Sequence, residues 1–249
     1  MTQEYLWLFY YNNSKLTYYS TYYIFINYMQ LFLSRSINFL QYIYGIFSWK
    51  SLFYKNVHKW FACNGNQKFL LNYPLDKNSL VFEVGWYKWI FTDDIINKFD
   101  CYLYIFEPIG EYYNILIEKY KDNEKVKVYH FGLGKTNGTL ELGLLDDGTS
   151  AFKKWKLETV EIRKFSDFIQ ENNISNIDLI SINIEWGEYD LIEDIVSSGN
   201  IHLMENIQIQ FHDFVKNALF LRDQSIVALT KSHNKVYTFP FVWEGFKRK

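Results

Sequence analysis

The stretch Leu80-Val81-Phe82-Glu83-Val84-Gly85 decides the fold class, because a short apolar run is followed at once by a glycine. The next residues, Trp86-Tyr87-Lys88-Trp89, complete a pattern of strand, tight turn and helix start. In α/β proteins this layout opens a pocket for a nucleotide-like cofactor at the end of the strand. Glycine suits the turn, because the backbone must bend sharply and approach the ligand closely. Tryptophan at positions 86 and 89 would instead fill that space.

Beyond Gly85 the hydrophobic pattern alternates between a period of two and a period near 3.6, which predicts strands alternating with helices. The expected strands span residues 80–84, 101–106, 126–131, 139–145, 159–162, 177–184, 206–211 and 235–242. The expected helices span residues 92–99, 112–120, 165–172, 189–197 and 216–232. This alternation builds right-handed βαβ units. The fold class we expect is therefore α/β and Rossmann-like, a mostly parallel sheet with helices on both faces.

The composition limits the classes of partner and cofactor. A chain of 249 residues has room for one α/β domain and an extension. Its formal net charge of -2 gives no global attraction to nucleic acid or to an anionic membrane, so we expect no nucleic-acid partner. The two cysteines, Cys63 and Cys101, form neither a disulfide framework nor a metal-ligand spacing, and we expect buried, inert thiols and no metal site.

Residues 1–57 differ from the expected catalytic domain, residues 58–249. Residues 16–34 are uncharged and rich in tyrosine, yet too polar for a confident spanning helix. Glu4 lies where a signal peptide would carry positive charge. The open alternatives are helices packed on the domain, weak contact with a membrane surface, and disorder or a misassigned start codon. We expect a cytoplasmic protein, with membrane association as the second alternative.

An acidic residue, Glu107, follows the second expected strand. It comes 22 residues after Gly85. A carboxylate at this distance suits a ribose diol, because two hydroxyl donors meet two acceptor oxygens. The other interpretation is a solvated strand end. Both NAD and S-adenosylmethionine carry such a ribose, but the G-x-G-x-x-G pattern that holds a pyrophosphate is absent. This favours methyl transfer over a nicotinamide-dependent oxidation.

Polar residues also gather after the strands expected at 177–184 and 206–211. Asn183 and Glu185 share one face of the first strand, and Glu188 follows on the first helical turn. Two close carboxylates raise the pKa of one of them, which suits a general base. His212 ends the other strand and is a candidate base or ligand. The alternatives are a helix-start acid, a solvated acid and a structural histidine.

Several separated motifs together resemble the FkbM family of S-adenosylmethionine-dependent methyltransferases. They lie at residues 81–85, 105–108, 131–134, 177–180, 184–185, 187–190 and 210–213, within a resemblance that runs from about residue 59 to residue 244. The resemblance implies a class I methyltransferase fold and O-methylation of a small-molecule, sugar or glycan hydroxyl. It implies cofactor contacts at Glu83, Gly85, Glu107 and Asn183, and catalytic roles for Glu185, Glu188 and His212.

The chain departs from the family pattern at three glycine positions, which hold Trp86, Trp89 and Trp186. It also has Glu83 and Asn183 where aspartate is usual. Each overfilled site could cost about 1–3 kcal/mol, against a total stability of about 5–15 kcal/mol. One hypothesis is a catalytically inactive descendant that serves as a binding or interaction module. The other is a translation artefact, in which UGA codons for glycine were read as tryptophan; 12 glycines beside 8 tryptophans agree with it.

Overall fold

The computed structural model describes residues 51–85, 91–144, 156–185, 187–213 and 215–249. The chain divides after Lys55, and the second unit comprises residues 56–249. Trp86, Trp89 and Trp186 lie outside the described residues. Residues 1–50 also lie outside them, so the alternatives stated for this segment stay predictions. None of the helices within the described ranges is long and apolar enough to cross a membrane.

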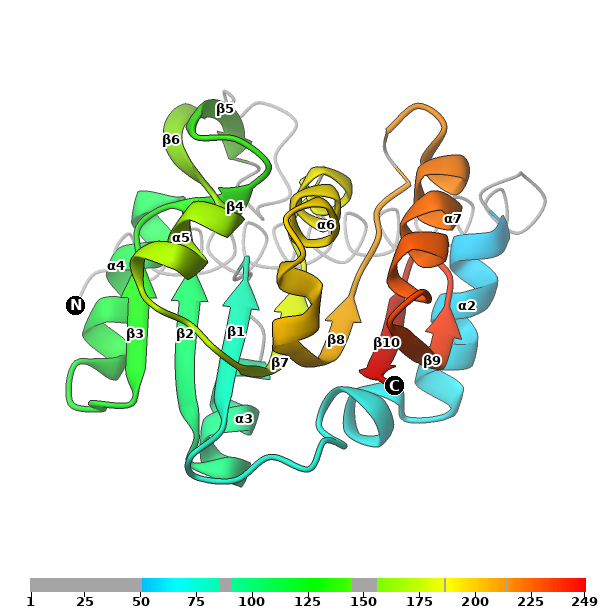
Figure 1. The fold of residues 1–249 in the computed structure, drawn as a ribbon, viewed down its shortest axis with the longest axis horizontal. Coiled ribbons are helices and arrows are strands. Elements are labelled where there is room, and N and C mark those ends of the chain that lie inside the picture. The colour runs from blue at the N-terminus through cyan, green and yellow to red at the C-terminus, as the bar shows by residue number, and fades with distance from the viewer. Residues whose placement is uncertain (1–50, 86–90, 145–155, 186, 214) are drawn as a thin grey trace, which may run out of the picture. The chain divides into compact units, whose positions relative to one another are not determined.

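A seven-stranded sheet forms the centre of the second unit (Figure 1). Its order is β3-β2-β1-β7-β8-β10-β9. The strands are β1 (Leu80–Val84), β2 (Tyr102–Phe106), β3 (Val126–Tyr129), β7 (Ile177–Ile182), β8 (Met204–Ile209), β9 (His233–Phe239) and β10 (Trp243–Arg248). The first five in this spatial order pair in parallel, while β10 runs antiparallel to both β8 and β9.

The order of the five parallel strands is that of a Rossmann-type sheet, in which the strand order reverses beside the first strand. Strand β1 lies at this point, between β2 and β7, and four of its five residues are buried. A strand covered on both faces is apolar nearly throughout, and residues 80–84 are apolar except for Glu83. The predicted fold class, Rossmann-like α/β with a mostly parallel sheet, is confirmed.

Helices cover both faces of the sheet, as predicted. They are α2 (Ser51–Ala62), α3 (Phe91–Phe99), α4 (Gly110–Tyr120), α5 (Phe165–Glu171), α6 (Glu188–Ser197) and α7 (Ala218–Leu229), with short turns η1 (Asn66–Leu70) and η2 (Asn200–Leu203). On one face, Ile95 of α3 and Leu116 of α4 share a core with Val81 and Leu103. Helices α5, α6 and α7 lie on the other face (Figure 1).

The second face is held by aromatic packing. Phe168 of α5 stands edge-on to Phe106 of β2, with 5.0 Å between ring centroids, and to Tyr129 of β3, with 5.1 Å. Phe106 and Tyr129 stack on each other at 5.1 Å. Edge-to-face and stacked pairs at these distances stabilise a core beyond the area they bury. This packing fixes β2 and β3 where their carboxyl ends leave the sheet.

Two details of the sequence prediction are wrong. The strand expected at 126–131 is shorter, since β3 ends at Tyr129, and a strand that was not predicted follows: Gly132 begins β4 (Gly132–Gly134) of a second sheet with β6 (Lys156–Lys164) and β5 (Gly138–Leu144). The closing strand expected at 235–242 is a hairpin of β9 and β10. Its turn contains Pro240, and Phe241 adopts a φ of 62°, so the strand cannot continue through them.

Candidate functional site

Four residues line up where neighbouring parallel strands leave the sheet. The N–H of Glu107 donates to Tyr129 O (3.0 Å), that of Gly85 to Phe106 O (3.0 Å), that of Asn183 to Val84 O (2.9 Å) and that of Gln210 to Ile182 O (2.9 Å). These bonds place Glu107, Gly85, Asn183 and Gln210 side by side, and we call them the edge row. Ligands of open α/β sheets bind beyond this carboxyl edge, at the point where the strand order reverses.

Gly85 makes a turn that no other residue fits without strain. Its φ is +84°, and a Cβ placed on it would lie 2.3 Å from the carbonyl oxygen of Asn183 and 2.6 Å from Cγ2 of Ile184. The φ value lies in the left-handed region, which side chains disfavour, and the two distances show that the segment after β7 leaves no room for a side chain at position 85. The close approach brings Gly85 and Asn183 together at the edge, as the sequence suggested.

Glu107 is buried, with 2% of its surface exposed, at the end of β2. Its Oε1 accepts a hydrogen bond from the N–H of Ile109 at 2.7 Å. The next amide, that of Gly110, donates to Oε1 of Glu158 at 2.8 Å. A carboxylate has two oxygens, each of which can accept more than one hydrogen bond.

Glu83 lies on β1, two residues before Gly85 of the edge row. Thr92 Oγ1 of α3 lies 3.0 Å from Oε1 and 2.9 Å from Oε2 of this carboxyl group. Burial raises the pKa of Glu83 to about 8, although the hydrogen bond from Thr92 lowers it. At neutral pH the group is therefore largely protonated, because the interior disfavours its charged form. The structure thus joins Glu83 to α3.

Glu188 and His212 form a pair across the carboxyl edge. Oε1 of Glu188, at the start of α6, accepts the main-chain N–H of His212 at 2.7 Å and lies 3.3 Å from its ring Nδ1. The Glu188 side chain is 0% exposed and that of His212 is 11% exposed. Within the described residues, Oε2 of Glu188 has no hydrogen-bond partner. The pair combines a buried acceptor with an imidazole that can exchange a proton.

The two glutamates that the sequence placed in one pocket have different environments. Glu188 is fully buried against His212, whereas Glu185 is exposed in the loop before α6. Tyr189 was not predicted as a site residue: its hydroxyl donates to the carbonyl of His212 at 2.7 Å, and its ring stacks on Phe211 at 5.5 Å. Glu188 and Tyr189 thus hold the main chain of His212 at both its N–H and its carbonyl. Nothing in the local pattern of a helix start indicates this contact.

His130 also lies near the edge row. It follows β3, next to Glu107 in the order of strands, and its ring stacks on Tyr113 of α4 with 4.4 Å between centroids. The described ranges contain no group of three or more His, Cys, Asp or Glu residues that could hold an ion.

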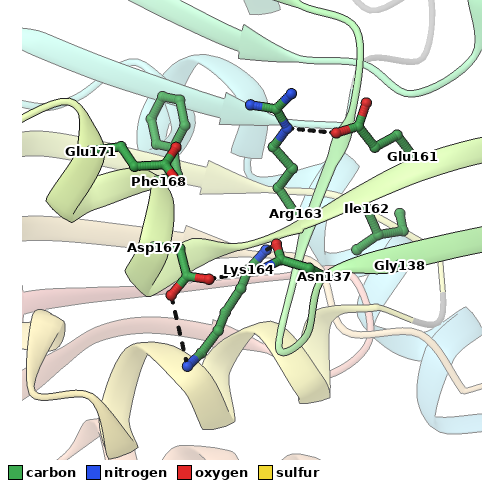
Figure 2. Close-up of a pocket in the computed structure, with 9 residues that line it drawn as sticks. All are labelled: Asn137, Gly138, Glu161, Ile162, Arg163, Lys164, Asp167, Phe168 and Glu171. Atoms are coloured by element: carbon green, nitrogen blue, oxygen red, sulfur yellow. Dashed lines mark hydrogen bonds and ion pairs between the residues drawn. The ribbon is translucent and has the colours of Figure 1, made fainter.

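A shallow groove of about 280 Å³ lies elsewhere, between β6 and α5 (Figure 2). Figure 2 shows Arg163 paired with Glu161 and Asp167 facing Lys164. No residue of the edge row lines this groove. Four of its charged groups pair with one another on an exposed surface, and we take the carboxyl edge as the candidate site.

Comparisons with known proteins identify no family. No family model matches the chain, and no curated protein matches it. Solved structures with a similar fold include the methyltransferase FkbM of Methylobacillus flagellatus KT, at 12% identity and a TM-score of 0.48, over 71% of this chain and 45% of that one. An rRNA methylase of Streptococcus thermophilus shows 12% identity and a TM-score of 0.45, over 74% and 94%.

A third structure is the N-methyltransferase NodS of Bradyrhizobium japonicum WM9 with S-adenosyl-L-homocysteine, at 10% identity and a TM-score of 0.36, over 68% of this chain and 78% of that one. All three proteins are methyltransferases by name. This chain spans less than half of the FkbM structure. With such low identities and TM-scores below 0.5, membership of the FkbM family and the absence of a nucleic-acid partner stay predictions. The fold class rests on the strand order described above.

Proposed function

We propose that the chain is an S-adenosylmethionine-dependent O-methyltransferase with a sugar or glycan hydroxyl as acceptor. The observation that carries the proposal is the edge row, in which a bare glycine turn at Gly85 lies between a buried carboxylate, Glu107, and a polar amide, Asn183. This is the arrangement in which an open α/β sheet holds an adenosyl group. Glu107 would accept the two ribose hydroxyls, and Asn183 would contact the same cofactor.

The acceptor chemistry is inferred from His212. When bound, the cofactor supplies a methyl group on a sulfonium, which mainly requires correct positioning of the acceptor oxygen. The hydroxyl proton must leave as the new carbon–oxygen bond forms. If Nδ1 of His212 carries its proton toward Glu188, Nε2 is the basic ring atom and takes the hydroxyl proton. Glu185, exposed at the same edge, is the alternative base.

The runner-up function is a binding or interaction module on the same fold. It follows from Trp86, Trp89 and Trp186, which stand at three positions where the resemblance places glycine. Three large side chains there would occupy the space of the cofactor. Under this proposal, the contacts of the edge row would preserve the fold and the site would no longer bind an adenosyl compound.

Calorimetry with S-adenosylmethionine separates the two functions. The chain as written and a triple variant, Trp86→Gly with Trp89→Gly and Trp186→Gly, are titrated side by side. Binding by both supports the enzyme, and binding by the triple variant alone supports an obstructed site. Absence of binding in both, with the fold intact by circular dichroism, would overturn the cofactor assignment. The codons at these three positions decide between an inactive descendant, with UGG, and a translation artefact, with UGA.

Acceptor class is tested next on whichever form binds the cofactor. Transfer of a radiolabelled methyl group to a mixture of monosaccharides and oligosaccharides is the expected result. A ribosomal RNA fragment serves as the competing acceptor, because the formal net charge of -2 predicts no attraction to phosphates. Label transferred to RNA and not to sugar would contradict the acceptor that we propose.

A further inference from the structure

Glu158 contacts the site from a different sheet. It lies on β6, 51 residues after Glu107 in the chain, yet its Oε1 accepts the N–H of Gly110 at 2.8 Å. Glu107 accepts the preceding amide, that of Ile109, at 2.7 Å. Two carboxylates from different strands therefore hold two consecutive amides where α4 begins. Neither the sequence pattern nor the edge row indicates this role for Glu158.

The start of α4 needs these two acceptors. The first N–H groups of a helix have no partner within the helix, and the usual solution is a polar side chain at the capping position. That position is Ile109, which makes no capping side-chain hydrogen bond. Negative charge is also favoured at this end of a helix by its dipole. Glu107 and Glu158 together supply what Ile109 cannot.

The second sheet packs against the same segment through apolar contacts. Gly132 of β4 is buried, and a Cβ placed on it would lie 2.8 Å from Cδ1 of Ile162 and 3.6 Å from Cγ of Pro108. Glu158 and Ile162 lie on one face of β6, since they are four residues apart on a strand. A Cβ on Gly110 would lie 3.1 Å from the Glu158 carboxylate. This close fit fixes residues 108–110 relative to β6.

We propose that Glu158 is a positioning residue: by holding the amide of Gly110 it fixes the first turn of α4, and thereby the orientation of the Glu107 carboxylate. The role of Glu107 toward a ribose rests on the proposed function. The effect of Glu158 on the conformation of residues 107–110 does not depend on the proposed function, and it can be measured without ligand. Glu158 itself touches no reacting atom.

The ligand-free test is amide hydrogen exchange by NMR on the full chain. In Glu158→Ala the amide of Gly110 loses its acceptor, and we expect faster exchange there and at Ile109, whose acceptor, Glu107, is intact. Glu158→Gln retains an acceptor oxygen and should restore most of the protection. Glu161→Ala is the matched control, because Glu161 is exposed on the same strand and pairs with Arg163. Unchanged exchange at Ile109 in Glu158→Ala would overturn the proposal.

The ligand test uses adenosine and S-adenosylhomocysteine with the form of the chain that binds them. We expect Glu158→Ala to raise the Kd of both ligands by about tenfold, which corresponds to the loss of one helix cap. In a Glu107→Gln background the same substitution should raise the Kd much less, because both changes act through the carboxylate of Glu107. Additive losses would contradict positioning. If no form binds an adenosyl compound while Ile109 responds, the proposed function fails and the role of Glu158 stands.

Discussion

Oε1 of Glu188 lies 2.7 Å from the main-chain nitrogen of His212, although the two residues come from the start of α6 and from the segment after β8. The same oxygen lies 3.3 Å from Nδ1 of the His212 ring. A single carboxylate thus fixes both the backbone and the side chain of the histidine. This places an acidic partner on one ring nitrogen, the arrangement by which carboxylates orient catalytic imidazoles.

Glu188→Gln should therefore lower methyl transfer and leave cofactor binding almost unchanged. The amide still accepts the N–H of His212, but it no longer stabilises a protonated ring. General-base contributions of this kind are about 10²- to 10⁴-fold, and we expect kcat to fall by at least about 10-fold with an unchanged Kd for S-adenosylmethionine. The measurement is steady-state kinetics beside calorimetry.

Glu193→Gln is the control for Glu188→Gln, because Glu193 is exposed on the same helix and pairs only with Lys135 among the contacts described. Its kcat should match that of the unsubstituted chain. Glu185→Gln tests the other candidate base. A larger loss of kcat in Glu185→Gln than in Glu188→Gln would transfer the proton acceptor from His212 to Glu185.

Much of the fold follows from the periodicity of the sequence. The parallel strands of the main sheet between residues 80 and 211 were predicted from their apolar runs, because parallel strands covered on both faces are largely apolar. The hairpin of β9 and β10 escaped prediction for a physical reason. Its turn is made by Phe241 with a φ of 62°, a conformation that phenylalanine rarely adopts. The turn is closed by the N–H of Val242, which donates to Phe239 O at 2.8 Å, and the Phe241 side chain is buried.

The candidate site could be predicted only where it depends on strand order. Gly85, Glu107 and Asn183 were predictable, because the carboxyl ends of neighbouring parallel strands share one edge. The contacts of Glu158 with Gly110 and of Tyr189 with His212 were not. Both join residues more than 20 positions apart, and their geometry is set by how the second sheet and α6 pack. A single sequence contains no periodic signal for such pairs.

Gly85→Ala should destabilise the unit more than the same substitution at Gly199. Both glycines have positive φ, +84° and +81°, but only Gly85 has backbone within 2.3 Å of the position that a Cβ would occupy. The φ strain costs about 1–2 kcal/mol and overlap adds about 1–3 kcal/mol. In chemical denaturation, the free energy of unfolding should fall by the φ strain alone in Gly199→Ala. In Gly85→Ala it should fall by the sum of the φ strain and the overlap.

Gly138→Ala completes the comparison of glycines, since this residue has neither a positive φ nor any atom within 4 Å of the position that a Cβ would occupy. Its free energy of unfolding should change by less than about 0.5 kcal/mol. Equal losses at Gly85 and Gly199 would show that Asn183 and Ile184 move aside, and that the close contact between β1 and β7 is not rigid.

The carboxyl group of Glu83 predicts a loss of stability as the pH rises from about 4.5 to about 8. Its pKa is raised to about 8 from the usual 4.5, chiefly by burial, so the folded state holds a proton that the unfolded state releases. Stability from this group is fully present below about pH 4.5 and is lost as pH rises through 8. Glu83→Gln, a neutral mimic, should flatten this dependence when unfolding is measured between about pH 5 and 9.

Thr92→Val sharpens the test of Glu83. The Thr92 hydroxyl lowers the pKa of Glu83, so its removal should raise that pKa further and extend the loss of stability to higher pH. A pH profile that is the same in Glu83→Gln and in the unsubstituted chain would mean that another group, and not Glu83, causes the loss.

A buried ion pair joins α7 to β10. Arg222 donates through Nε to Oε1 of Glu244 at 2.5 Å and through Nη2 to Oε2 at 2.9 Å, and the two side chains are 8% and 1% exposed. Removing one partner of a buried pair leaves the other charge uncompensated and costs about 3–5 kcal/mol. The loss of stability in Glu244→Gln should lie near the lower end of this range, because Asp223 still pairs with Arg222 at 2.9 Å. In chemical denaturation Asp223→Asn, on the exposed side, should cost under about 1 kcal/mol, and a larger loss there than at Glu244 would reverse the assignment of the stabilising pair.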